Sequence, residues 1–224
     1  MANATLAQRI QDLVGFDYAS NSINTEDEAL ETACAEVLDS LPDELLLKYA
    51  VAPSDLTSGS PTMEIEGKKV IRVARIEGSG KMHRPCEKLT IEEYLNKTKD
   101  TNSIYFPTKH SPVYTEDPES GTTLLRVFPA ITGSADAAES AKVWYITYPH
   151  GDFDGNDALD GFPSEAEHAV ALKASMYILD AMISDKVQDD EDQEMLQMLT
   201  AQKQNLQATY QIEMGRLTGA QGEQ

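Results

Sequence analysis

One acidic segment of the sequence has the residue types and part of the spacing of a metal-binding loop. Carboxylate or amide side chains stand at its first, third and fifth positions, which suits a hard cation such as Ca²⁺. The rest of the calcium-loop pattern is missing, because Asp157 stands where the loop needs glycine and Pro163 where it needs a bidentate glutamate. We therefore interpret the segment as a polar connector. The alternative is a calcium site with the candidate ligands Asp152, Asp154, Asn156 and Asp160.

The remaining reactive side chains form no known catalytic or metal-binding pattern. Cys34 falls on the apolar stripe of a predicted helix, where a cysteine belongs to the core, and Cys86 lies in a different segment. Two such cysteines are no disulfide framework and are typical of a reducing compartment. The sequence has no GxSxG, P-loop or GxGxxG motif, so we predict no enzymatic activity, no catalytic residue and no cofactor. The histidines lack zinc-site spacing and are His83, His110, His150 and His168.

The formal net charge of −20 lies entirely at the two ends of the chain. Residues 1–59 carry 11 acidic and 2 basic side chains, residues 60–149 carry 12 of each, and residues 150–224 carry 15 and 4. Because nucleic acids and anionic membranes attract basic proteins, this charge argues against a protein that binds either of them. The longest apolar stretch is also too short to span a bilayer, so we expect no membrane partner.

Helical patterns occupy both acidic ends. Apolar residues recur at helical intervals between residues 25 and 41, and the segment LPDELLLKYA then begins a second helix with its proline in the first turn. Near the other end, Ser164 is the expected cap of a helix, with Glu167 reaching back to it. Residues 169–183 are apolar on nearly every face, which predicts burial on all sides. A last helix, 190–217, has an apolar stripe of Leu196, Leu199, Leu206, Tyr210 and Leu217.

The neutral middle of the chain is rich in β-strand patterns. The turn sequence Asp117–Gly121 separates two strand-like runs and predicts a hairpin. Thr90 and Glu93 have capping-box spacing, which predicts a short helix over residues 90–96. No helix of 10–15 residues separates the strands, so we expect an antiparallel sheet. The strand candidates are residues 69–76, 103–106, 112–115, 122–128 and 142–148.

The shared composition of the two ends predicts one domain that is interrupted by another. The expected fold class is α+β, with an α-helical bundle made from the N- and C-terminal helices and an inserted antiparallel β-rich domain. The expected boundaries are 1–59 for the N-terminal helices, 60–149 for the β-rich domain, 150–217 for the C-terminal helices and 218–224 for a flexible tail.

This layout resembles the head-to-tail adaptor proteins of short-tailed bacteriophages, also called tail tubular protein A, and more loosely other phage neck proteins. The resemblance is carried by TEDEALETACAEVLDSLPDELLLKYA at the front, by a strand-rich module ending in VWYITYP, and by the segment from FPSEAEHAVALKASMYIL to EMGRL at the back. It implies a structural virion protein in the phage neck, made in the host cytoplasm. Alternatives are another head or tail completion or assembly protein, and a calcium-binding module.

The resemblance also implies the partners. They are the portal protein, the tail nozzle or tail tube protein, and further copies of the chain in a ring, twelvefold in the family, with tail fibres as an additional candidate. Viral DNA would pass through such a ring during genome ejection without specific binding, and a negative charge suits passage because it repels phosphate. A ring would also explain residues 169–183, since one face could pack in the protomer and another against a neighbour.

The last helix suggests where a partner binds. Its final third, residues 207–217, is expected to outrun the preceding helix and to lack apolar partners in its own chain. Such an end would find a groove on the portal or on a neighbouring subunit. The predicted anchors are Tyr210, Met214 and Leu217.

Overall fold

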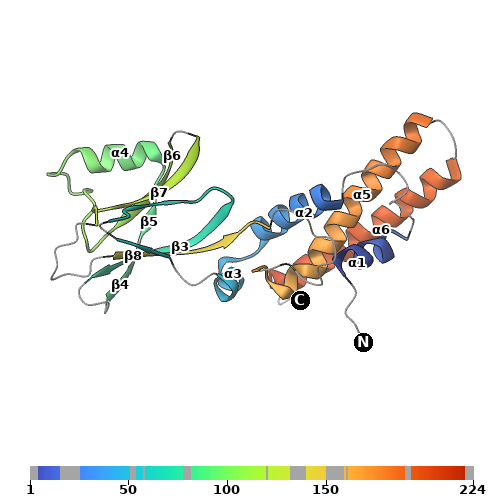
Figure 1. Ribbon diagram of the computed structural model, residues 1–224, viewed down its shortest axis with the longest axis horizontal. Helices are drawn as coiled ribbons and strands as arrows, with labels where there is room; N and C mark the ends of the chain where they lie inside the picture. The colour runs from blue at the N-terminus through green and yellow to red at the C-terminus, as the bar shows by residue number, and fades with distance from the viewer. Residues whose placement is uncertain are drawn as a thin grey trace. The chain divides into compact units, whose positions relative to one another are not determined.

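A computed structural model describes residues 5–15, 26–50, 54–57, 59–77, 82–119, 121–131, 140–149, 159, 161–189 and 193–219. These residues form six α-helices, one short 3₁₀ helix and two four-stranded sheets, which confirms a mixed α and β protein consistent with the α+β class (Figure 1). The chain divides into two compact units. Residues 1–49 and 148–224 form the helical unit, and residues 50–147 form the β unit.

The helical unit draws its elements from both ends of the chain. Thr5 begins the first helix with a reciprocal capping box, in which Gln8 and Thr5 satisfy each other's backbone N–H groups. Gly15, at a φ of 73°, ends that helix in the left-handed conformation that glycine adopts without strain. The elements are α1 (Leu6–Val14), α2 (Glu26–Ser40), α3 (Asp43–Tyr49), η1 (Ser164–Ala166), α5 (Glu167–Asp189) and α6 (Gln193–Leu217).

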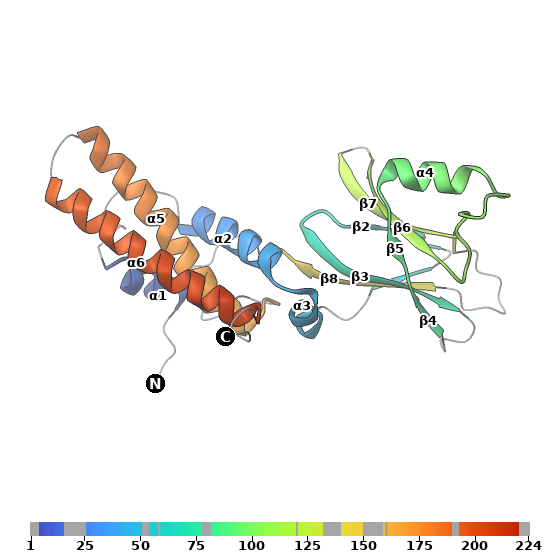
Figure 2. The ribbon, with the colours of Figure 1, turned by 180° about the vertical axis from the view of Figure 1, so that it is seen from behind.

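Helix α5 is the centre of the helical unit, because α1, α2 and α6 all pack against it (Figure 2). Its apolar residues are therefore covered by three helices of the same chain. The expectation that a neighbouring subunit is needed to bury this helix is wrong, since α1 and α2 come from the distant N-terminal segment and supply the missing surface. The buried residues of α5 include Ala169, Val170, Leu172, Ala174, Met176, Ile178, Leu179 and Met182.

The start of α5 differs from the predicted capping box. Ser164 opens the 3₁₀ turn η1 and provides no cap, and the helix begins three residues later. Glu167 is buried and bonds elsewhere, accepting from Arg9 at 3.5 Å and from the backbone N–H of Leu159 at 3.4 Å. Arg9 lies on α1, so a contact across 158 residues of sequence has replaced the local cap.

The β unit consists of two sheets with the strand orders β1-β8-β3-β4 and β2-β7-β6-β5. A short helix, α4 (Ile91–Lys99), lies against β6 (Figure 1). Its predicted capping box between Thr90 and Glu93 is confirmed. The strands are β1 (Ser54–Leu56), β2 (Thr62–Glu64), β3 (Lys68–Glu77), β4 (Met82–Pro85), β5 (Glu87–Lys88), β6 (Val113–Glu119), β7 (Thr122–Phe128) and β8 (Ser140–Thr147).

The two sheets share one apolar core. Alternate residues of β8, with Val73 of β3, meet alternate residues of β7, with Tyr114 of β6, as expected when two half-buried sheets pack face to face. The core residues are Leu56, Ile65, Val73, Tyr114, Leu125, Val127, Ile131, Ala141 and Val143.

Three predictions about the β unit need correction. Residues 103–106, a strand candidate, form turns in the loop between α4 and β6. The sheets are not wholly antiparallel, because β5 pairs in parallel with β6. Helix α4 and a long connection separate these two strands and provide the crossover that a parallel pair requires. The β unit also begins before residue 60. Strand β1, which lies inside the segment assigned to helices, pairs with β8 and buries Leu56, although it is too short to show an alternating pattern.

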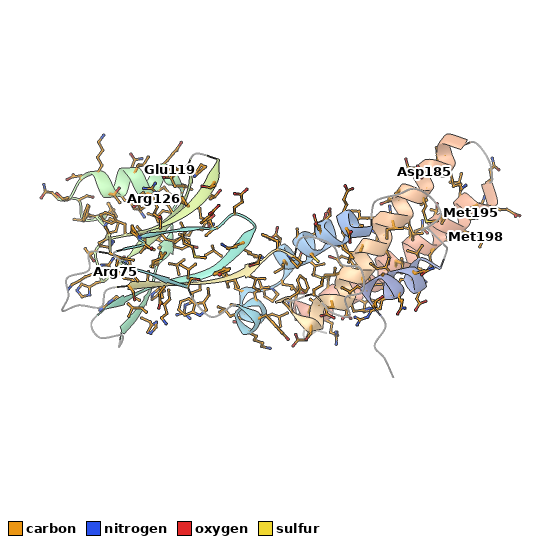
Figure 3. The ribbon with its side chains drawn as sticks, viewed as in Figure 1. Arg75, Glu119, Arg126, Asp185, Met195 and Met198 are labelled. Carbon is orange, nitrogen blue, oxygen red and sulfur yellow. The ribbon has the colours of Figure 1, made fainter. Side chains whose placement is uncertain are left out.

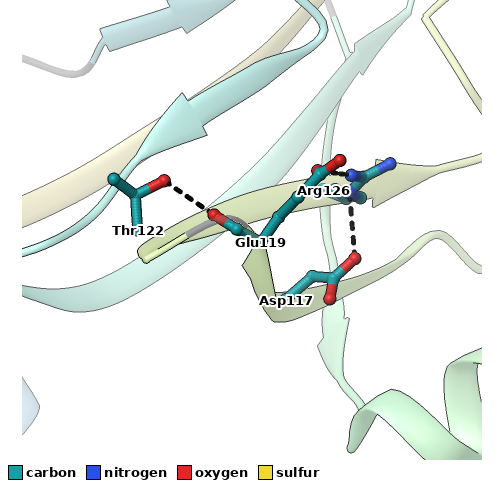
Figure 4. Close-up of polar contacts among 4 residues, drawn as sticks. All are labelled: Asp117, Glu119, Thr122 and Arg126. Atoms are coloured by element: carbon teal, nitrogen blue, oxygen red, sulfur yellow. Dashed lines mark hydrogen bonds and ion pairs between the residues drawn. The ribbon is translucent and has the colours of Figure 1, made fainter.

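The predicted hairpin is formed by β6 and β7, and its charged residues bridge the two strands (Figure 4). Arg126 Nε lies 3.2 Å from Asp117 Oδ2, and its guanidinium also bonds to Glu119. Thr122 Oγ1 donates to the backbone carbonyl of Glu119 at 3.1 Å. Strand β6 extends through Pro118, a residue that the sequence pattern assigned to the turn. Proline is tolerated there because β5 covers only the first two residues of β6.

Candidate functional site

A groove between α5 and α6 contains the most concentrated set of polar contacts in the helical unit. Lys173 lines this groove, and its ammonium lies 2.8 Å from Glu36 Oε2 on α2. The same ammonium lies over two aromatic rings, 5.1 Å from the centroid of Tyr177 and 5.6 Å from that of Tyr210. Tyr177 also donates its hydroxyl hydrogen bond to Glu36. One lysine thus links α2, α5 and α6.

The groove has a volume of about 300 Å³. A second ion pair, between Lys203 of α6 and Asp180 of α5, lies along it. The Lys203–Asp180 ion pair and the contact of Lys173 with the ring of Tyr210 fix an antiparallel register of α5 and α6, because residue 203 lies beside residue 180 and residue 210 lies beside residue 173. The groove offers aromatic faces, amides and paired charges. Its lining residues are Lys173, Met176, Tyr177, Asp180, Lys203, Gln207, Tyr210 and Gln211.

The charges of the groove are tuned by their contacts. Hydrogen bonds from Lys173 and Tyr177 lower the pKa of Glu36 below its ordinary value. Burial lowers the pKa of Lys173, but the hydrogen bond to Glu36 and the electrostatic interactions with Tyr177, Glu36 and Tyr210 together outweigh this and leave the pKa raised. Burial raises the pKa of both Tyr177 and Tyr210. At neutral pH Glu36 and Lys173 are therefore both charged, and the hydroxyl groups of Tyr177 and Tyr210 are neutral.

The Glu36–Lys173 pair should make a small, pH-dependent contribution to stability. Because folding lowers the pKa of Glu36, its contribution is present above the ordinary value of 4.5 and is lost as the pH falls below it. We expect Glu36→Gln to lower the free energy of unfolding by less than about 1 kcal/mol at pH 7, since the pair is half-exposed. The difference from the wild-type chain should shrink towards zero between pH 4.5 and pH 3 in denaturant titrations.

The control for this measurement is Glu28→Gln on the same helix. It removes one negative charge from an exposed carboxylate that makes no ion pair with another described residue. A Glu36→Gln effect that persists unchanged at pH 3 would show that the ion pair is not its cause.

The three predicted anchors of α6 lie on the side of the helix that faces its own unit. Tyr210, Met214 and Leu217 are each half-buried, and Tyr210 packs on Lys173. The expectation that residues 207–217 outrun the preceding helix is wrong. Helix α6 has 25 residues and α5 has 23, and η1 adds one further turn before α5. Binding of a partner through these residues stays a prediction.

The opposite side of α6 is apolar and open to solvent, which the sequence did not reveal. Met198 and Ile212 are 58% and 63% exposed. They are fourteen residues apart, so they lie on nearly the same face of the helix, and small side chains stand between them. Figure 3 labels Met198 near the start of α6. We define the outer face of α6 as the exposed residues Met198, Ala201, Asn205, Ala208 and Ile212.

The outer face was not predicted from the sequence, because the leucine stripe on the other side of α6 dominates the helical pattern. Alanine and asparagine look like a solvated surface when they are read one by one. A signal was present in the spacing, since residues 198, 205 and 212 follow a seven-residue repeat, which is the spacing of helices that pack against another helix.

The candidate metal ligands Asp152, Asp154, Asn156 and Asp160 lie outside the described residues. Within the part that the structure describes, no three His, Cys, Asp or Glu side chains are grouped so that they could hold a metal ion. His83, His110 and His168 are exposed, and His150 is not among the described positions.

The two cysteines are poorly placed for reaction. Cys34 is fully buried in the helical unit, which agrees with its predicted core position. Burial raises the pKa of Cys34 to about 12 and the pKa of Cys86 to about 11. Because the thiolate is the reactive form of cysteine, both thiols are inert at neutral pH.

Over the described ranges, no helix combines the length and the apolar character that crossing a bilayer requires. Comparison with known proteins found no protein-family model that matches this chain, and no curated protein with a matching sequence.

Proposed function

We propose that this protein is a structural virion protein, a head-to-tail adaptor that forms a ring between the portal and the tail nozzle of a short-tailed phage. In this role it acts as an assembly platform and as a conduit for DNA. The observation that carries the proposal is the division of the chain, in which residues from both ends build one helical unit and the residues between them build another. The adaptor resemblance in the sequence has the same order of parts.

We further propose that the helical unit is one bundle into which the β unit is inserted. Two contacts at the junctions support this. On the N-terminal side Tyr49 donates its hydroxyl hydrogen bond to Glu165. On the C-terminal side Tyr148 donates to Asp39 Oδ1 at 2.8 Å. The last residue before the β unit and the first residue after it are therefore both tied to helices of the helical unit, as an insertion requires.

In the proposed ring, the outer face of α6 binds the portal. An exposed apolar stripe on a long helix is suited to a groove on another protein, which it enters through residues one or two turns apart. Small residues at 201 and 208 let a partner approach the helix backbone closely. This assignment is separate from the predicted anchors Tyr210, Met214 and Leu217, and its exposed side chains can contact a portal without disturbing the helical unit.

The test of this proposal is attachment to DNA-filled heads that carry a portal but no tail. We expect the double variant Met198→Asp/Ile212→Asp to bind such heads at least tenfold more weakly in co-sedimentation, because a charge must be desolvated at each contact. Both side chains are more than half exposed, so the variant should fold normally.

A matched control is Gln204→Asp, which adds a negative charge to an exposed position on another side of the same helix. It should bind heads like the wild-type chain. If the wild-type chain itself does not bind portal-containing heads, the proposed function is wrong. If the double variant binds as well as wild type, the outer face is not the portal contact.

A further inference from the structure

Three exposed large apolar side chains lie on α4 and in the loop that follows it. Leu95 on the helix is 59% exposed, and Ile104 and Tyr105 in the following loop are 90% and 71% exposed. Lys97 and Lys99 lie on the same helix and Lys109 follows the loop. We call these six residues the tip. Among residues 95–111 the charge is three lysines against one aspartate, in a chain whose net charge is −20.

The tip is held in place by aromatic residues beneath it. Phe106 meets the ring of Phe128 on β7 edge to face, with 5.4 Å between the ring centroids. Tyr94 on α4 meets the same ring from another side at 6.2 Å. Phe128 therefore anchors the helix and the loop together, and the residues next to each anchor, Leu95 and Tyr105, are turned outward.

Hydrogen bonds fix the loop between these anchors. The backbone N–H of Ser103 donates to the carbonyl of Asp100 at 3.1 Å, and that of Phe106 donates to the carbonyl of Ser103 at 3.0 Å. Asp100 Oδ1 also accepts from the N–H of Asn102 at 2.9 Å. An ordered loop that exposes Ile104 and Tyr105 is preorganised to bind, because it has already lost its conformational freedom.

An acidic surface that matches the tip lies on the helical unit. A groove of about 200 Å³ between α2 and α5 is lined by Glu28, Ala29, Thr32, Tyr177 and Ala181. Glu31 lies three residues from Glu28 on the same helix, and Asp185 lies one turn beyond Ala181 on α5. The groove thus has an apolar floor and three carboxylates at or near its rim, where the tip has an apolar centre and three lysines.

Other grooves fit the tip less well. The groove around Lys173 also contains Lys203, which would repel the lysines of the tip. The groove on α6 around Leu196 and Ala201 is lined by no charged residue. Charge complementarity therefore selects the groove between α2 and α5.

We propose that the tip of one copy of this chain docks in the α2–α5 groove of a second copy. The apolar side chains of the tip contact Ala29, Tyr177 and Ala181, and its lysines face Glu28 and Glu31. Because the two surfaces differ, the contact is heterologous, which is the kind of contact that builds a ring when the rotation between neighbours divides a full turn. The inference rests on the proposed ring and names the contact that joins its subunits.

The contact can be tested by cross-linking two full-length single-cysteine-addition variants. One carries Asn102→Cys beside the tip, and the other carries Thr32→Cys at the groove together with a mass tag. A short bis-maleimide should join them into a heterodimer, because both added positions are exposed. The natural thiols should not interfere, since burial raises the pKa of Cys34 to about 12 and that of Cys86 to about 11.

Three changes separate the proposed contact from random collision. Ile104→Ser and, separately, Lys97→Glu/Lys99→Glu in the tip variant should each reduce the rate of cross-linking at least tenfold. Glu28→Lys/Glu31→Lys in the groove variant should restore the rate with the charge-reversed tip, because the two rims again carry opposite charges. Moving the second cysteine to the exposed Ile212 on α6 provides the background rate.

The inference is overturned if the Asn102→Cys and Thr32→Cys variants cross-link no faster than the Ile212→Cys background, or if charge reversal has no effect. Binding to portal-containing heads, measured on the same proteins, separates this result from the proposed function. If the protein binds heads but the specific cross-link does not form, only the subunit contact is rejected. If the specific cross-link forms but the protein does not bind heads, the adaptor function is rejected and the subunit contact stands.

Discussion

Replacing Leu179 by alanine is expected to lower the stability of the helical unit by about 2–5 kcal/mol. Leu179 lies in the middle of α5 and is fully buried. Because α1, α2 and α6 surround this helix, the cavity left by the missing side chain is closed on all sides and cannot collapse easily. Denaturant titration followed by helical circular dichroism measures the loss.

The matched control is Val187→Ala on the same helix. Val187 is 61% exposed, so the substitution should change stability by no more than about 0.5 kcal/mol. An equally small effect of Leu179→Ala would mean that α5 is not the central helix of its unit.

The second large effect is expected in the β unit, where Leu125→Ala should cost about 2–5 kcal/mol. Leu125 lies on β7, is fully buried and belongs to the core that the two sheets share. The chain contains one tryptophan, Trp144 on β8, which also packs under the guanidinium of Arg72. Its fluorescence therefore reports on the β unit, while the helical circular dichroism signal comes mainly from the other unit.

Together the two variants test whether each unit has its own stability. Each unit has a separate core, so we expect Leu125→Ala to shift the fluorescence transition and Leu179→Ala to shift the circular dichroism transition. If either substitution moves both transitions equally, the chain unfolds as one cooperative body and the division into units has no thermodynamic meaning.

Helix α5 is covered by helices of its own chain, so its apolar residues do not require a neighbouring subunit in the proposed ring. An all-round apolar helix needs a subunit interface only when its own chain cannot cover it, and here three helices do so. Two other surfaces expose several apolar residues, the outer face of α6 and the tip. Those two surfaces now carry the expected contacts, with the portal and with a second copy respectively.

The sequence by itself determined the elements whose signals are local. The capping box of Thr90 and Glu93 starts α4 because its two hydrogen bonds join residues three positions apart. The turn at Gly121, with its φ of 90°, allows β6 and β7 to form a hairpin. The burial of α5 and the core position of Cys34 follow from apolar side chains at regular intervals. Such features need no knowledge of distant residues.

Only the tertiary structure decided the features that depend on distant residues. Glu167 has the spacing of a local cap, but Arg9 binds it from α1. Tyr210 has the pattern of a free anchor, but it packs on Lys173, whose charge is paired with Glu36 of α2. The exposed tip and the outer face of α6 also depend on which faces the neighbouring elements cover. Local pattern fixes where a side chain lies on its helix or strand, and the packing of distant segments decides whether that side is buried, paired or left open.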